Sequence, residues 1–208
     1  MKSLEILIKN GHVVDGCGNP WFHADIGVKH GRIVAIGSMK GRHATRVIDA
    51  SEKIVSPGFI DTHTHSDAVL LANPTADSHL HQGITTNVVG NCGISMTPVS
   101  EAAKRHFDSV LRASSLKWEW NSLQEYLDTL EAHGVGVNVV PLIGQGTLRA
   151  AVVGMEDRPP NEQELRDMKS QVAGQMEAGA FGMSTGLFYA PSGFASTEEL
   201  IELAKVVA

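Results

Sequence analysis

Hydrophobic and polar residues alternate in the first quarter of the chain. Leu4, Ile6 and Ile8 recur at every second position, and two further strand candidates, residues 24–29 and 32–37, lie on the two sides of His30-Gly31. A period of two residues is typical of strands with one buried face. The pairs Asn10-Gly11 and His30-Gly31 predict hairpin turns between such strands. Residues 1–55 are therefore predicted to form a small β-domain.

From residue 56 onward, short apolar segments alternate with longer amphipathic stretches, a pattern that indicates βα units and a parallel sheet. The predicted strands are residues 54–60, 84–90, 136–143 and 180–187. The predicted helices are residues 121–133, residues 161–178 with Asn161 and Glu164 as a capping box, and a last helix that opens on a second box, Ser196-x-x-Glu199. Residues 144–160 and 188–195 are predicted to be long loops after strands.

Four βα units are half of what a closed (β/α)8 barrel contains. The fold class is thus predicted to be α/β, with a β-domain in residues 1–55 and a partial barrel in residues 56–208. Either this second domain is a smaller open sheet, or the chain is cut in the middle of a barrel; we favour the cut. Such a cut would leave open sheet edges through which the chain could self-associate.

The composition excludes several function classes. The chain has 208 residues, 42% of them hydrophobic, and a formal net charge of -6, which argues against a nucleic-acid partner. The N-terminus lacks the apolar core of a signal peptide, and no window approaches the length of a membrane span. Cys17 and Cys92 do not form a disulfide framework. The sequence predicts a soluble, cytoplasmic protein.

The candidate chemistry begins at the end of the first predicted strand of the second domain, where Asp61, His63 and His65 would share one face. Two adjacent imidazoles suit a divalent metal such as zinc, whereas the alternative is a pair of turn histidines bonded to carbonyls. Asp61 is either a hydrogen-bond partner of a ligand ring or a strand-end cap. Asp67 is predicted to be a loop hydrogen-bond acceptor.

Cys92 occupies the matching position after the next predicted strand, between the flanking glycines Gly90 and Gly93. A thiolate is a strong zinc ligand, and the histidine pair makes ligation more plausible than the usual role of a small buried residue. Cys17 is predicted to be a turn residue without function. His106 and His133 are expected on solvated helix faces.

Five segments resemble the amidohydrolase superfamily, and within it the N-acyl-D-amino-acid deacylases (D-aminoacylases). They are Pro57-Gly-Phe-Ile-Asp-Thr-His-Thr-His-Ser-Asp67, Gly83-Ile-Thr-Thr86, Gly90-Asn-Cys-Gly-Ile-Ser95, Pro141-Leu-Ile-Gly-Gln-Gly-Thr-Leu-Arg149 and Ala178-Gly-Ala-Phe-Gly-Met-Ser-Thr-Gly-Leu-Phe-Tyr189. The resemblance covers essentially the whole chain, as the N-terminal portion of such an enzyme. It implies a β-sandwich beside a TIM barrel, with zinc held by His63, His65 and Cys92.

The resemblance also implies that Tyr189 contacts a small N-acyl-D-amino acid, whose non-peptide amide bond is hydrolysed by water activated on zinc. Many relatives bridge their metals with a carboxylated lysine, and residues 178–192 contain no lysine, which favours the cysteine branch. The family often has histidine where this chain has Gln145. The acid–base aspartate and two further histidine ligands are expected beyond residue 208, so the chain alone is expected to have little activity. Two alternatives stay open: another amidohydrolase, acting on cyclic amides or as a deaminase, or a non-catalytic metal-binding or self-associating remnant.

Overall fold

The computed structural model describes residues 3–101, 103–105, 112 and 117–208. The chain divides into two compact units, the N-terminal unit Met1–Gly58 and the C-terminal unit Phe59–Ala208. His106 lies outside the described residues. Among the described helices, none is long and apolar enough to cross a bilayer.

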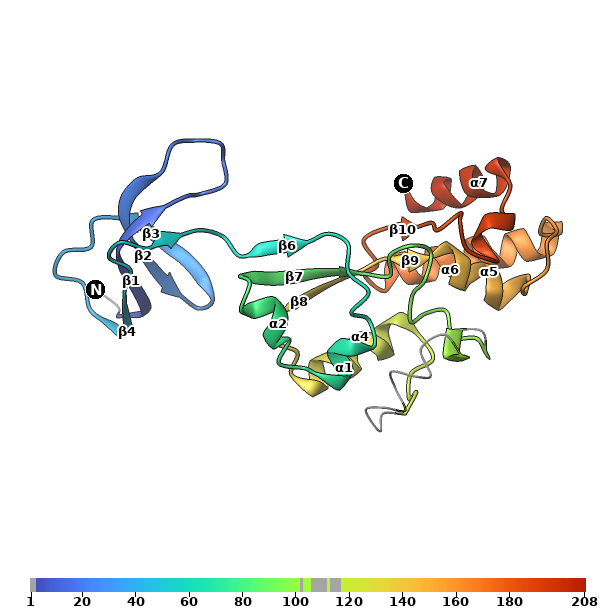
Figure 1. Cartoon of the computed structure of the whole chain (residues 1–208), viewed down its shortest axis with the longest axis horizontal. Helices are drawn as coiled ribbons and strands as arrows, with labels where there is room; N and C mark the ends of the chain where they lie inside the picture. The colour runs from blue at the N-terminus through green and yellow to red at the C-terminus, as the bar shows by residue number, and fades with distance from the viewer. Residues whose placement is uncertain (1–2, 102, 106–111, 113–116) are drawn as a thin grey trace. The chain divides into compact units, whose positions relative to one another are not determined.

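The N-terminal unit is a single five-stranded sheet (Figure 1). Its strands are β1 (Leu4–Val13), β2 (Phe22–Lys29), β3 (Arg32–Gly37), β4 (Ala44–Asp49) and β5 (Ile54–Val55). The order is β3-β2-β1-β4, and β5 also pairs with β1. The β1–β2 and β2–β3 pairs are antiparallel, whereas β4 and β5 run parallel to β1.

One of the two predicted hairpin turns is wrong. His30 and Gly31 do form the β2–β3 turn, with φ values of 52° and 66°. Asn10, however, lies inside β1 with a φ of 62°, where the register with β2 shifts between Ile8 and Gly11. Asn tolerates this left-handed conformation in a β-bulge as well as in a turn. Its side chain donates to Asp49 Oδ1 (3.0 Å), which favours the bulge over a turn.

The C-terminal unit contains a parallel sheet of β6 (Phe59–Asp61), β7 (Ile84–Val89) and β8 (Asn138–Pro141), in the order β6-β7-β8. A second parallel pair joins β9 (Ile143–Gly144) to β10 (Met183–Ser184). The predicted strand at residues 54–60 is split into β5 and β6 by Ser56-Pro57-Gly58, because proline has no N–H for a ladder. The predicted strand at residues 180–187 is reduced to the two residues of β10.

Among the described residues, the helices of this unit include α1 (Val69–Ala72), α2 (Asp77–Leu80), α4 (Leu123–His133), α5 (Gln145–Val152), α6 (Glu162–Glu177) and α7 (Thr197–Val207), with a short 3-10 helix at Ser192–Phe194. Figure 1 shows α1, α2 and α4 on the same side of β6, β7 and β8. The loop predicted at residues 144–160 is therefore partly wrong, since α5 begins at Gln145. Its glycines favour a loop locally, but Leu148 is fully buried, and this burial stabilises the helix.

The helix caps agree with the sequence in part. Asn161 and Glu164 form the predicted capping box at α6. At α7, Ser196 accepts a hydrogen bond from the Glu199 N–H, but the Glu199 carboxylate does not return it. That carboxylate bonds instead to Arg149 and Gln145. The second capping box is thus only half formed, because a buried cation competes for the same carboxylate.

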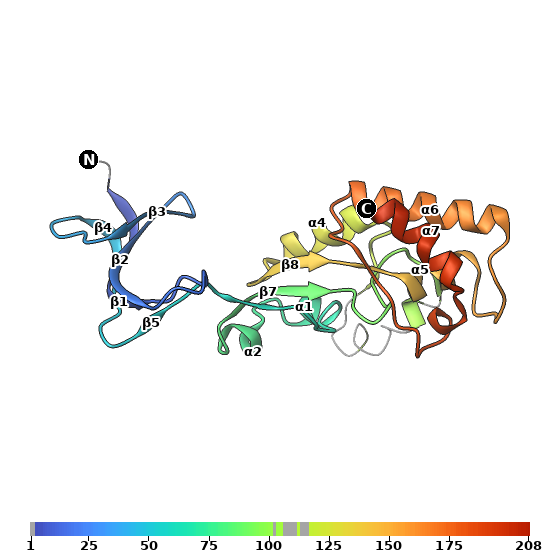
Figure 2. The same ribbon diagram turned by 90° about the horizontal axis from the view of Figure 1, so that it is seen from above.

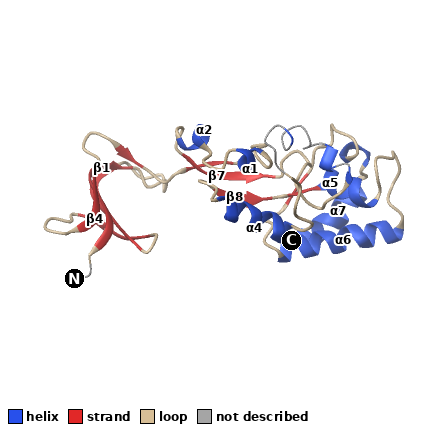
Figure 3. Cartoon of the chain, turned by 90° about the horizontal axis from the view of Figure 1, so that it is seen from below, coloured by secondary structure: helices blue, strands red, loops and turns tan. Residues whose placement is uncertain are grey.

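The main hydrophobic core lies in the C-terminal unit. Helices α5, α6 and α7 lie together in both Figure 2 and Figure 3. They contribute four fully buried residues to one hydrophobic cluster: Leu148, Met168, Val172 and Leu203. The packing of these helices fixes the loops that follow β7 and β10, and the start of α5, which follows β9 directly. Those loops, together with the segment after β6, carry the residues discussed next.

Candidate metal centre

The segment after β6 places two imidazoles beside each other. Strand β6 ends at Asp61, so His63 and His65 follow the strand instead of lying on its regular face as predicted. Asp61 Oδ1 accepts a hydrogen bond from the His63 N–H (3.1 Å) and turns the chain at this point. The two histidine rings nevertheless have centroids 5.6 Å apart, and both side chains are exposed. Of the two alternatives predicted for Asp61, this hydrogen bond corresponds to the strand-end cap.

The segment after β7 brings a sulfur to the same place. Gly90, Cys92 and Gly93 all have positive φ values, of 81°, 54° and 73°, which bend the backbone as the flanking glycines predicted. Cys92 Sγ lies 3.2 Å from His63 Nε2. A Cβ on Gly90 would lie 2.1 Å from the Leu142 carbonyl oxygen, so only glycine fits this bend.

One donor atom each from His63, His65 and Cys92 lies within 4.8 Å of the others. Nitrogen and sulfur ligands of one tetrahedral zinc are separated by about 3.3–3.6 Å, given bond lengths of about 2.0–2.3 Å. The observed set is close to this spacing, and rotation of exposed side chains can close the difference. Two imidazoles and a thiol also match the donor types that zinc prefers. The residues present therefore fit the metal that the family resemblance implies.

Buried hydrogen bonds hold the two ligand segments together. Asp67 is 2% exposed, and its Oδ1 accepts a bond from the Gly90 N–H (2.8 Å). Burial raises the pKa of the Asp67 carboxyl to about 7, against the lowering effect of the backbone bonds. Asn91 Nδ2 donates to the Thr64 carbonyl (3.2 Å), which links the residue beside Cys92 to the residue between the histidines. Asp67 is thus a loop acceptor, as predicted.

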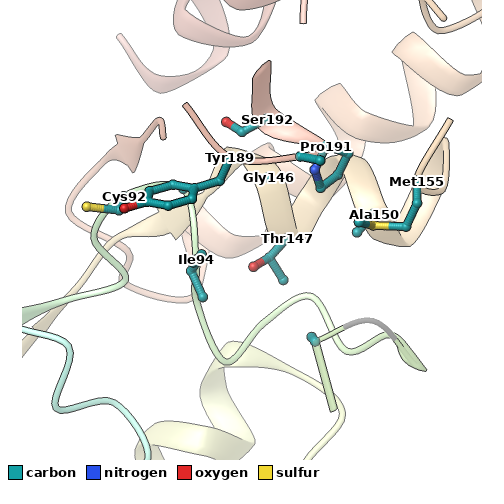
Figure 4. Close-up of a pocket in the computed structure, with 12 residues that line it drawn as sticks. Cys92, Ile94, Gly146, Thr147, Ala150, Met155, Tyr189, Pro191 and Ser192 are labelled. Carbon is teal, nitrogen blue, oxygen red and sulfur yellow. The ribbon is translucent and has the colours of Figure 1, made fainter. Parts of the chain in front are cut away.

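Tyr189 approaches from the loop after β10 and lines the same pocket as Cys92 (Figure 4). Its side chain is 51% exposed, and its N–H donates to the Gly186 carbonyl (2.8 Å). A Cβ on Gly186 would lie 1.9 Å from the Cys92 carbonyl oxygen, so this loop passes directly over the cysteine segment. The structure thereby places the predicted substrate-contacting residue beside the predicted metal ligand.

A buried polar network behind this loop was not predicted. Gln145 is fully buried, accepts a hydrogen bond from Ser192 Oγ and donates to Glu199 Oε1 (2.9 Å). Glu199 also forms an ion pair with Arg149, and both side chains are almost completely buried. The sequence feature that could have predicted this network is Arg149, a charged residue within the apolar run from Leu148 to Val153. A charged residue in such a run indicates a buried partner of opposite charge.

Comparison with known proteins identifies the class of this chain. Residues 46–205 match the family model described as "Amidohydrolase family", so the chain belongs to the amidohydrolase family and the predicted resemblance is confirmed. It is 39% identical over 202 residues to a D-aminoacylase of Alcaligenes xylosoxydans xylosoxydans, which covers 97% of this chain and 41% of the relative. It is 40% identical over 207 residues to an N-acyl-D-glutamate deacylase of the same organism, and this match covers 100% of this chain and 42% of the relative.

Solved structures agree. An N-acyl-D-glutamate deacylase from Bordetella bronchiseptica, complexed with zinc and a phosphonate inhibitor, matches with a TM-score of 0.87 and 36% identity over 99% of this chain and 43% of that chain. A D-aminoacylase structure matches with a TM-score of 0.86 and 36% identity, and the match covers 98% of this chain and 43% of that chain. The predicted α/β class is confirmed at this level. The chain spans about two fifths of the length of the relatives it matches.

Proposed function

We propose that this chain is the metal-binding N-terminal part of a zinc-dependent N-acyl-D-amino-acid deacylase, which hydrolyses a linear, non-peptide amide bond. One observation carries the proposal: His63, His65 and Cys92 converge at the carboxyl ends of the neighbouring parallel strands β6 and β7. Ligand sites of α/β folds form at this edge of a parallel sheet. The names of the similar deacylases supply the substrate class.

Each residue has a distinct role in this proposal. His63 and His65 would hold zinc through imidazole nitrogens and Cys92 through its thiolate, and zinc when bound supplies a Lewis acid and an activated water. Asp61 fixes the backbone of His63, while Asp67 fixes that of Gly90, so that both ligand segments are held in place before the metal arrives. Tyr189 would contact the substrate next to the metal.

The finer description of the fold belongs to this proposal. Residues 1–55 would form part of a β-sandwich, and residues 56–208 the first half of a (β/α)8 barrel. The parallel register of β6, β7 and β8 and the parallel pairing of β9 with β10 support the barrel half. The single sheet of the N-terminal unit supports one layer of a sandwich.

The two described ligand segments carry two carboxylates, and each accepts a backbone N–H. Asp61 Oδ1 accepts from the His63 N–H, and the buried Asp67 accepts from the Gly90 N–H through Oδ1, so both are assigned to holding the ligand segments and not to proton transfer. A general acid–base group contributes about 10²–10⁴-fold in rate. Purified 208-residue chain should therefore hydrolyse N-acetyl-D-amino acids at most weakly. Turnover at ordinary enzymatic rates would show that an acid–base group is present within these residues.

Cobalt substitution tests the metal centre without requiring activity. A thiolate bound to Co²⁺ gives a sulfur-to-metal charge-transfer band, which should appear with one thiolate per chain and disappear in Cys92→Ser. Cys17→Ser is the matched control, because Cys17 is a free, exposed cysteine of the N-terminal unit. A band that survives Cys92→Ser, or that is lost in Cys17→Ser, would refute the proposed ligand set.

Self-association through a sheet edge is also proposed. Strand β6 pairs only with β7 among the described strands, and Phe59 and Ile60 are 60% and 61% exposed. An exposed apolar edge strand is a template for pairing with another copy. Sedimentation velocity should show concentration-dependent association that Ile60→Lys weakens, with Leu187→Lys as a control at an exposed loop position. Equal association of both variants and the parent would contradict the edge as the contact.

A further inference from the structure

The loop after β10 is fixed at its beginning to the segment that carries Cys92. Ser184 Oγ, at the end of β10, donates to the Gly90 carbonyl and accepts a hydrogen bond from the Gly93 N–H (3.0 Å). These two partners flank Cys92, so the bonds hold the loop against the backbone on both sides of the thiol. A Cβ on Gly93 would lie 2.8 Å from the backbone nitrogen of Gly186, so the two segments are in close contact.

Tyr189 lies within a compact turn further along this loop. Its N–H donates to the Gly186 carbonyl and its carbonyl accepts from the Gly193 N–H, both at 2.8 Å. Ser192 Oγ closes the turn by accepting from the Gly186 N–H (3.2 Å), and it donates in turn to the side chain of Gln145. The turn is therefore held together as one piece, and Gln145 connects it to α5.

The chemistry of the side chains behind the turn fixes the direction of each hydrogen bond. Arg149 can only donate and the Glu199 carboxylate can only accept, and the two form a buried ion pair. Gln145 Nε2 donates to Glu199 Oε1 (2.9 Å), so the amide oxygen faces Ser192. The hydroxyl hydrogen of Ser192 is then used by Gln145, and a lone pair is left for the Gly186 N–H. An apolar side chain in place of the amide would interrupt this series at its centre.

We propose that Gln145 is a positioning residue, which holds the turn that carries Tyr189 beside the Cys92 segment. The inference rests on the proposed function, since it takes Tyr189 as a substrate contact and Cys92 as a metal ligand. Figure 4 shows the Tyr189 ring directed toward Cys92. Without the amide, the loop stays attached at Ser184, but the ring is released from its place next to the donors.

Hydrogen–deuterium exchange of the metal-free chain, measured by mass spectrometry, tests this attachment. Gln145→Leu keeps the approximate size of the side chain and leaves Glu199 paired with Arg149. Exchange in residues 185–193 should accelerate about fivefold to a hundredfold, as expected when a buried partner is lost. Gln175→Leu is the matched control, because Gln175 is 7% exposed and its Oε1 accepts a bond from another buried side chain. Equal exchange of the loop in the two variants would overturn the proposal.

Fluorine NMR measures the position of Tyr189 relative to the donors. The chain has two tyrosines, Tyr126 and Tyr189, so labelling with fluorotyrosine gives two signals. Tyr126 is buried on α4 and its hydroxyl donates to the Asp67 carbonyl (2.9 Å), so its signal is the internal reference. With paramagnetic Co²⁺ at the donors, Gln145→Leu should lose most of the broadening of the Tyr189 signal and leave the Tyr126 signal as in the parent.

A conservative variant and a smaller one separate positioning from general stability. Gln145→His restores one donor and one acceptor in the neutral imidazole and should keep more of the Tyr189 broadening than Gln145→Leu. Ser192→Ala removes a single oxygen on the loop side and should release Tyr189 without changing the core behind it. Broadening equal to that of the parent in Ser192→Ala would overturn the proposal, and so would equal losses in Gln145→His and Gln145→Leu.

The metal-free and Co²⁺ measurements distinguish failure of this inference from failure of the proposed function. If Co²⁺ gives no thiolate band and broadens neither tyrosine signal, the metal centre is refuted, and exchange in the metal-free chain still decides the role of Gln145. If Co²⁺ binds through Cys92 and the variants do not release Tyr189, only the role of Gln145 is refuted.

Discussion

The buried ion pair between Arg149 and Glu199 should dominate the stability of the C-terminal unit. The two side chains are 0% and 1% exposed, and they come from α5 and α7, far apart in sequence. Glu199→Gln removes the negative charge while it keeps the size of the side chain. The guanidinium then stays buried with the Arg158 carbonyl as a remaining acceptor, and Arg149 Nε has no hydrogen-bond partner among the described residues.

Breaking a buried pair by neutralising one partner costs about 3–5 kcal/mol, because the other charge is left uncompensated. Domains of this size have total stabilities of about 5–15 kcal/mol. With a urea dependence of about 2 kcal/mol/M, the unfolding midpoint of Glu199→Gln should fall by about 2 M. Circular dichroism and intrinsic tryptophan fluorescence, recorded on the same urea series, measure this shift.

A control variant and a double-mutant comparison complete the test. Glu198→Gln changes the same residue type at the neighbouring, exposed position of α7 and should shift stability by less than about 0.5 kcal/mol. The double variant Arg149→Met with Glu199→Leu removes both charges and should lose far less than the sum of the losses of Arg149→Met and Glu199→Leu, each measured alone. A cost below about 1 kcal/mol for Glu199→Gln, or a double loss equal to that sum, would refute the reasoning.

The remaining predictions concern the ligand loop, a helix cap and acid stability. Gly90→Ala should reduce zinc affinity and destabilise the chain by more than Gly134→Ala, for which a cost of about 1–2 kcal/mol is expected. Gly134 is the control because it has a similar positive φ but open space around it. Equal losses of stability in the two variants would exclude the close approach of Gly90 to Leu142 as the cause. Asn161→Ala should cost about 1 kcal/mol in urea unfolding by removing the capping box of α6, and an unchanged midpoint would contradict that role. Hydrogen bonds from Lys169, and then from Lys205, hold the pKa of Glu202 at about 2, below its unfolded value. This lowered pKa stabilises the folded state above a pH of about 4, and the stabilisation is lost as the pH falls toward 2. The difference in free energy of unfolding between the parent and Glu202→Gln should therefore shrink as the pH is lowered from about 5 to about 2.5. A difference that grows over this range would reverse the assigned sign.

The sequence predicted the ligand candidates because their pattern is local. An apolar strand followed by His63 and His65, and a second strand followed by Gly90 and Cys92, place side chains at one edge of a sheet once the strands are parallel. The capping box at α6 and the turn at His30-Gly31 were predictable for the same reason, since every partner lies within a few residues.

Tertiary structure decided what local pattern leaves open. Asn10-Gly11 suits a turn and a β-bulge equally well, and bonds to Asp25 and Asp49, distant in sequence, selected the bulge. Glu199 could have closed a capping box, but a buried guanidinium 50 residues away took its carboxylate. The same long-range packing made a helix of residues 145–152 and formed the pocket beside Cys92 from segments that lie far apart in the sequence. Residue type and spacing thus determined which groups could bind a metal, whereas burial and competition between distant partners determined their surroundings.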